Sequence, residues 1–253
     1  AWRKLGEKQY LQLLDQGVGW AGELGLYVII DWHSIGDLLS GKFQETNGSG
    51  IYQTSKSETV DFWQTMAKHY GSNPTVAFFE LFNEPTTLSN PGGAETWPRW
   101  KNFMEELISI IRANDGKAVP LVAGFNWAYD LSPVAKDPVN APGIAYVSHP
   151  YPMKRKQPWE PQWTPDWGFV AEKYPVFLTE IGFCETSAAG AHDPVISDES
   201  YGKAITDYTG LRGISYTVWV FDPDWAPCLF TDWSYAPSRQ GAYFKKALQS
   251  RKP

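Results

Sequence analysis

The chain has 253 residues with a formal net charge of −6, and 43% of them are hydrophobic. This acidic balance disfavours a nucleic-acid partner or an anionic membrane surface, because both require a basic face that offsets phosphate charge. No run of about 18 apolar residues predicts a transmembrane helix, and the first residues lack the apolar stretch of a signal peptide. We expect a single domain over residues 1–253, because barrels of this length usually bury one core.

Short apolar runs alternate with amphipathic stretches along the chain. This alternation is typical of βαβ units and predicts an α/β fold with a parallel sheet. Six strands are predicted, over residues 26–31, 76–82, 119–123, 144–148, 176–180 and 214–221. Polar or aromatic residues follow each of them, so we expect a functional site at the carboxyl ends of the strands.

The helices have recognisable starts. Ser55 and Glu58 have capping-box spacing, and Pro98 follows Thr96 at the start of a later helix. The first helix is predicted over residues 8–24, and its apolar face would consist of Tyr10, Leu13, Leu14, Val18 and Leu24. Further helices are predicted near residues 167–174, 201–211 and 238–249.

Two glutamates close apolar strands. Glu84 lies in the run Phe82 to Pro85, and Glu180 ends the strand predicted over 176–180. A buried carboxylate is costly without a partner or a role, and one such residue could as well be a strand-end salt bridge. Two on different strands favour catalysis, because glycosidic bond hydrolysis needs one protonated and one ionised carboxyl group. The pattern alone leaves open which glutamate has which role.

Aromatic residues are abundant, with 13 Trp, 13 Tyr and 13 Phe. We expect more than half of them to fill the core. Those near strand ends or in loops have flat faces that could stack on sugar rings, and they include Trp32, Trp127, Trp225 and Trp233. His69 is expected on a helix surface and His192 in a loop. The titratable residues show no metal-ligand spacing, so neither a metal nor another cofactor is predicted.

The polar residues at the predicted strand ends resemble those of glycoside hydrolase family 5, the cellulase family. The resemblance extends from the first helix to the last, and it rests on motifs in a fixed order. These are Asp31-Trp32-His33-Ser34, Asn83-Glu84-Pro85, His149-x-Tyr151, Glu180 between Thr179 and Ile181, and Trp219. It implies a (β/α)8 TIM barrel and a retaining endo-β-1,4-glucanase that acts on β-glucan or cellulose, in a secreted or periplasmic setting.

The resemblance also implies roles for these residues. Glu84 would be the general acid/base and Glu180 the nucleophile, with carboxyl groups roughly 5 to 5.5 Å apart. Asn83 would bind the 2-hydroxyl of the sugar that is cleaved, and Tyr151 would hold Glu180. His33 and His149 would complete the polar floor, and Trp219 would form the platform under the sugar. Without the resemblance, Trp219 could also be a core residue.

The chain departs from the family pattern at its start. Six of the barrel's eight strands are visible, and the first two are not, including an arginine that supports the nucleophile. We expect the functional protein to include two further strands upstream of Ala1, because six strands alone would leave open sheet edges. Cys184 and Cys228 follow neighbouring strands of such a barrel, so we expect them to approach each other closely enough for a possible disulfide.

Other functions are weaker interpretations of the same residues. A relative that acts on mannan, xyloglucan or mixed-linkage glucan would use the same two glutamates. A carbohydrate-binding barrel without activity would have lost a carboxylate, and both are present. A serine hydrolase is disfavoured because the chain has no Gly-x-Ser-x-Gly elbow. The oligomeric state is not predicted.

Overall fold

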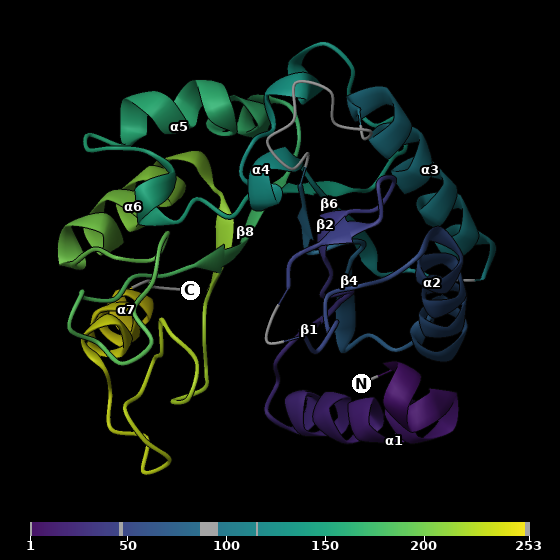
Figure 1. Cartoon of the computed structure of the whole chain (residues 1–253), viewed down its shortest axis with the longest axis horizontal. Helices are drawn as coiled ribbons and strands as arrows, with labels where there is room; N and C mark the ends of the chain where they lie inside the picture. Colours follow the sequence, from purple (N-terminus) through teal and green to yellow (C-terminus); the bar gives the residue numbers. More distant parts are fainter. Residues whose placement is uncertain (1, 46–47, 87–95, 115, 251–253) are drawn as a thin grey trace. The chain divides into compact units, whose positions relative to one another are not determined.

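The computed structural model describes residues 2–45, 48–86, 96–114 and 116–250. The chain forms two compact units. Unit 1 consists of Ala1–Val122 with Val139–Ile144, and unit 2 of Ala123–Pro138 with Ala145–Pro253. Each unit contains three of the six predicted strands, all parallel, with helices between them (Figure 1). The predicted α/β alternation is therefore confirmed.

The strands of unit 1 are β1 (Val28–Asp31), β4 (Val76–Glu80) and β6 (Val119–Ala123). Strand β4 pairs with both β1 and β6, so it is the central strand of the three. The prediction for β6 is confirmed at both ends. Strand β1 is shorter than predicted because Leu26 and Tyr27 are exposed and precede the first paired residue.

Three longer helices belong to unit 1: α1 (Trp2–Glu23), α2 (Lys56–Tyr70) and α3 (Trp97–Ala113). Helices α2 and α3 pack side by side (Figure 1). Ser55 caps α2 as predicted, because its hydroxyl accepts a hydrogen bond from the Glu58 amide at 3.2 Å. Helix α1 begins earlier than predicted and is kinked at Gly6, where φ is 74°.

The predicted apolar face of α1 is partly wrong. Val18 is buried and Tyr10 and Leu14 are half-buried, but Leu13 and Leu24 are exposed. Trp2 and Tyr10 instead make edge contacts with the Phe62 ring of α2. Aromatic contacts with α2 therefore indicate the buried face of α1 more reliably than the spacing of its leucines.

A second, smaller sheet in unit 1 was not predicted. It consists of β2 (Ile35–Asp37), β3 (Lys42–Phe43) and β5 (Glu84–Pro85). Strand β2 pairs with β3 in antiparallel fashion and with β5 in parallel fashion. Its strands have two or three residues each, too few to show an apolar period in the sequence.

Unit 2 contains β7 (Ala145–Val147), β8 (Val176–Ile181) and β9 (Ser215–Val218), with β8 in the centre. Helices α6 (Glu199–Arg212) and α7 (Arg239–Ser250) pack against each other and match the predicted ranges closely. The shorter helical segments are α4 (Phe125–Ala128), α5 (Glu160–Asp166), η1 (Ser132–Ala135), η2 (Pro152–Lys154) and η3 (Gly168–Glu172).

The helix predicted near residues 167–174 is present as the shorter 3-10 helix η3, not as an α-helix. Helix α5 ends before Trp167, whose backbone (φ −153°, ψ −28°) is not helical, and the 3-10 helix η3 follows. Trp167 is fully buried and makes an edge contact with Tyr208 at 5.2 Å between ring centroids. A side chain at Gly168 would collide with the Tyr208 hydroxyl. Tertiary packing against α6 therefore sets the conformation here.

The aromatic residues divide as expected between core and surface. Trp63, Trp100, Trp163 and Trp167 are essentially inaccessible, whereas Trp233 is 60% exposed. None of the helices within the described residues combines the length and apolar character of a membrane span.

Removing the N-cap residue of α2 tests how much the cap stabilises this helix. We expect Ser55→Ala to lower the free energy of unfolding by about 1 kcal/mol, because the Glu58 amide loses its acceptor. Ser57→Ala is the matched control, since Ser57 is exposed in the first turn of the same helix. Urea unfolding followed by circular dichroism measures both changes. Equal stabilities of the two variants would contradict the capping role.

Candidate active site

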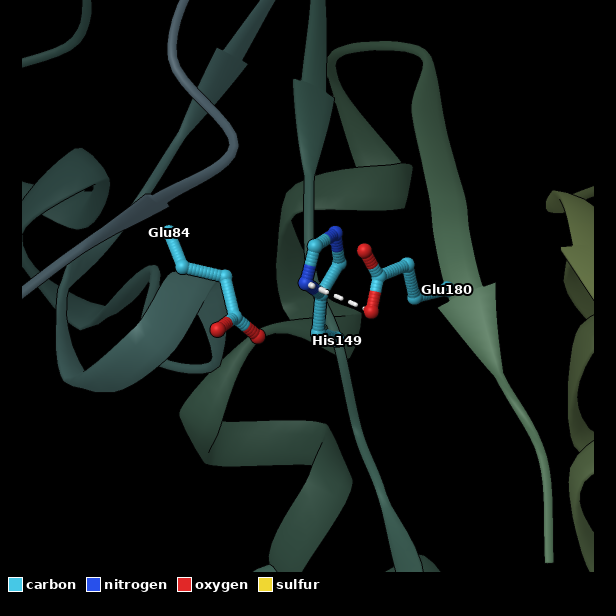
Figure 2. Close-up of side chains that lie close together, drawn as sticks. All are labelled: Glu84, His149 and Glu180. Carbon is cyan, nitrogen blue, oxygen red and sulfur yellow. Dashed lines mark ion pairs between the residues drawn. The ribbon is translucent and has the colours of Figure 1, made fainter. Parts of the chain in front are cut away.

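Glu180 lies near the carboxyl end of β8 and is only 8% exposed. Its Oε2 accepts a hydrogen bond of 2.8 Å from the Tyr151 hydroxyl. His149 Nδ1 lies 3.8 Å from the same oxygen (Figure 2). Tyr151 and His149 are buried as well. A hydrogen bond donated to a buried carboxylate stabilises its charged form, which a nucleophile requires.

The segment after β7 brings His149 and Tyr151 to this carboxylate. The Ser148 hydroxyl donates to the Tyr129 carbonyl at 2.9 Å, and the His149 amide donates to the Ala128 carbonyl at 3.0 Å. These bonds attach the chain leaving β7 to the segment around α4. His149 Nε2 lies 2.9 Å from the Thr179 hydroxyl, so its other ring nitrogen faces Glu180.

Trp219 follows β9 directly. Its amide donates to the Ile181 carbonyl at 2.9 Å, so the pairing between β8 and β9 continues one residue beyond the strand. The side chain is half-buried, and the peptide between Trp219 and Val220 is cis. Unit 2 therefore brings together Glu180, Tyr151, His149 and Trp219 at the carboxyl ends of its strands.

Unit 1 places the residues after β1 around a pocket. Trp32 and His33 line it together with Tyr10 and Asp31. The Trp32 indole donates to the Thr59 hydroxyl at 3.1 Å, and its ring lies 4.3 Å from that of Phe62. His33 Nδ1 lies 2.6 Å from Asp31 Oδ2. These contacts fix the orientation of both rings.

Asn83 and Glu84 lie beside this pocket, since they bond to the residues that follow β1. The backbone N–H of Asn83 donates to the Trp32 carbonyl at 3.1 Å, and the backbone N–H of Glu84 donates to the Ser34 carbonyl at 3.0 Å. Asn83 is 2% exposed, and its side-chain Nδ2 has no hydrogen-bond partner among the described residues. A buried amide with an unused donor is suited to bind a ligand hydroxyl.

The position of Glu84 corrects the sequence interpretation in one respect. Strand β4 ends at Glu80, and Glu84 belongs to the separate short strand β5, where it pairs with Ile35. Its side chain is half-buried, in contrast to that of Glu180. The two glutamates therefore have different surroundings, a condition for different protonation states.

Of the remaining predicted aromatic residues, Trp127 lies in the short segment α4 and Trp225 in a loop, both in unit 2. Trp127 has a positive φ of 55°, and Lys154 Nζ lies 4.9 Å above its ring. Trp225 follows β9 in the loop toward α7 and is 44% exposed. His69 lies on the surface of α2, next to Asp15, and His192 lies in a loop, both as predicted.

The two cysteines are free thiols, so the possible disulfide is not formed. Burial raises the pKa of the Cys184 thiol, and the charge of nearby Cys228 raises it further.

Comparison with known proteins decides the family. The model for Cellulase (glycosyl hydrolase family 5) matches residues 2–224. The chain belongs to this family. The resemblance found in the sequence is confirmed, and with it the enzyme class of glycoside hydrolase and the (β/α) barrel fold class.

Individual proteins are similar over most of the chain. A β-glucanase from Saccharophagus degradans, solved in complex with cellotetraose, is 48% identical with a TM-score of 0.94, covering 99% of this chain and 76% of its own. Endoglucanase A of Evansella cellulosilytica is 31% identical over 207 residues, which are 81% of this chain and 37% of that protein. Endoglucanase E-5 of Thermobifida fusca is 28% identical over 220 residues, 84% and 40% respectively. The chain thus spans less than half the length of these two relatives.

Sequence reasoning missed two supporting hydroxyls. Thr59 holds the Trp32 indole and Thr179 holds the His149 ring. Thr59 has no sequence signal beyond its place in the first turn of α2. Thr179 immediately precedes the nucleophile candidate in the family motif, which could have drawn attention to it.

Tyr151→Phe tests the support of Glu180 in this cellulase-family enzyme. We expect kcat on an aryl glycoside to fall by about 10- to 100-fold, because the carboxylate loses a charge-assisted hydrogen bond. Tyr243→Phe is the matched control, since its hydroxyl bonds Thr206 at the partly exposed contact of α6 with α7. An unchanged kcat for Y151F would contradict the role of Tyr151.

Proposed function

We propose that this chain is the catalytic domain of a retaining endo-β-1,4-glucanase that hydrolyses β-glucan through a covalent glycosyl-enzyme intermediate. The observation that carries the proposal is the buried Glu180 carboxylate with its Tyr151 hydrogen bond. Support comes from the similar β-glucanase, which binds cellotetraose, and from the endoglucanase relatives. A secreted or periplasmic location is part of the proposal and fits a polysaccharide substrate.

The first chemical step would form the intermediate. A Glu180 oxygen attacks the anomeric carbon while the Glu84 carboxyl protonates the glycosidic oxygen, and the bond between that carbon and oxygen breaks. In the second step Glu84 takes a proton from water, the water oxygen attacks the anomeric carbon, and Glu180 is released. Two inversions at one carbon retain its configuration.

The other site residues would position the sugar. The free Nδ2 donor of Asn83 is suited to the 2-hydroxyl of the sugar that is cleaved, a contact that strengthens in the transition state. Trp219 would stack under this sugar, and Trp32, Trp127 and Trp225 would bind further sugars of the chain. His149 would maintain the polar floor beside Glu180, and His33 would do so near Trp32.

A related β-glycanase that acts on mannan, xyloglucan or mixed-linkage glucan is the second candidate. The same catalytic pair would serve these substrates, and the loops that bind neighbouring sugars decide between them. Product analysis on a panel of soluble β-glucans and mannans distinguishes the candidates. Rapid release of cello-oligosaccharides with no turnover of mannan would support the endoglucanase.

Azide rescue tests the assignment of the two glutamates. We expect Glu180→Ala to abolish turnover of a β-aryl glycoside and azide to restore part of it, giving an α-glycosyl azide. We expect Glu84→Ala to lose about 10²- to 10⁴-fold in rate, the usual contribution of a general acid/base, and to give a β-glycosyl azide. Gas chromatography or NMR of the products identifies the anomers. The reverse pattern of anomers would exchange the roles.

The separation of the two carboxyl groups tests the retaining mechanism independently. We expect roughly 5 to 5.5 Å between them in a crystal structure with a bound oligosaccharide, and NMR of the first product should show the β-anomer. A separation near 9 Å together with the α-anomer would instead establish an inverting enzyme, because water would fit between the groups.

A further inference from the structure

Gln240 is a buried polar residue for which the catalytic mechanism so far gives no role. It is the second residue of α7 and is only 2% exposed. A buried amide is costly unless its donors and acceptor are paired, so its partners show what it stabilises.

All the hydrogen bonds of the Gln240 side chain go to backbone groups beyond the ends of β8 and β9. Nε2 donates to the Trp219 carbonyl and to the Pro227 carbonyl, both at 2.8 Å. Oε1 accepts from the Phe183 amide at 2.5 Å. One side chain therefore joins three backbone positions that lie outside the strands β8 and β9.

These segments carry the proposed nucleophile and the proposed sugar platform. Phe183 lies three residues after Glu180, and Trp219 is the platform itself. The Trp219 amide donates to Ile181, and the Val220 amide donates to the same Pro227 carbonyl that Gln240 binds, at 2.8 Å. The backbone on both sides of the Trp219 side chain is thus fixed, and Gln240 makes one of these attachments.

The surrounding glycines show how closely the amide is enclosed. A Cβ atom on Gly182 would lie 2.8 Å from both Gln240 Oε1 and the Trp219 carbonyl oxygen. A Cβ on Gly241 would lie 1.8 Å from the Leu229 carbonyl oxygen. The backbone at Gly182 and Gly241 is thus too close to its neighbours for a side chain at either position. This close packing leaves the Gln240 side-chain amide little freedom to move.

We propose that Gln240 is a positioning residue for glycoside cleavage, which holds the Trp219 platform in register with the strand that carries Glu180. The inference rests on the proposed function, since it needs Trp219 to contact the sugar. An amide is required because the site presents two carbonyl acceptors and one amide donor. A carboxylate would supply no donor, and an apolar side chain would supply neither donor nor acceptor.

Gln240→Glu and Gln240→Met test this role, since both replacements keep nearly the same size. We expect kcat on a soluble β-glucan to fall by about 10- to 100-fold in both, as when buried groups lose their partners, with KM changed less than about 2-fold. Kinetics are normalised to active enzyme by the burst of covalent intermediate. Gln249→Glu, on the exposed end of the same helix, is the matched control and should keep wild-type kinetics.

A pH series separates positioning from general stabilisation. At acid pH the introduced carboxyl of Q240E is protonated and regains one donor, so its kcat relative to that of Q240M should rise as the pH falls. This ratio cancels the titration of the catalytic glutamates, which both variants share.

Three outcomes overturn the positioning role while the wild type remains active. They are unchanged kcat per active enzyme in both variants, a constant ratio across the pH series, and loss of folding in both at every pH. An inactive wild-type chain on all β-glucans would instead overturn the proposed function, so the two failures are distinguishable.

Discussion

The buried carboxyl group of Glu180 is the constraint on which the proposed site in unit 2 depends. A carboxylate that is 8% exposed is tolerated only where donors compensate for its lost hydration. Tyr151 provides such a donor, and it does so because the chain leaving β7 is tied back to the Ala128 and Tyr129 carbonyls. Ala128 adopts a φ of 55°, an unfavourable conformation for a residue with a side chain. The segment that presents these carbonyls is therefore strained.

In unit 1, aromatic and amide groups of the proposed site are held in fixed orientations. The indole of Trp32 is fixed at both its polar and its apolar surface, by the Thr59 hydroxyl and the Phe62 ring. The backbone carbonyl of Trp32 accepts a hydrogen bond from the backbone amide of Asn83. This bond places Asn83 and Glu84 beside the residues that follow β1, rather than on β4. The small sheet of β2, β3 and β5 is therefore a scaffold for two of the proposed site residues.

Local signals predicted the features that depend on neighbours in sequence. The Ser55 cap of α2 and the bounds of β6 follow from capping and apolar runs, and the structure has both. The 3-10 conformation that follows Trp167 depends on packing against Tyr208, and the placement of Glu84 depends on pairing with Ile35. Such partners are distant in sequence and have no period, so the apolar pattern predicted neither the 3-10 geometry of this helix nor the separate strand that contains Glu84. The role of Tyr151 was found only through the family resemblance, since nothing local distinguishes it from the other tyrosines.

Two buried amides show how burial and hydrogen bonding together indicate what a polar residue does. Asn83 and Gln240 are both 2% exposed and have the same functional group. Both donor hydrogens of Gln240 are used by backbone carbonyls, whereas the Asn83 Nδ2 has no partner among the described residues. An amide whose hydrogen-bonding groups are all paired with the backbone stabilises one backbone arrangement, so its role is structural. A buried amide with an unused donor raises the energy of the empty site. A sugar hydroxyl that accepts its hydrogen bond recovers that energy, so such an amide contributes to ligand binding.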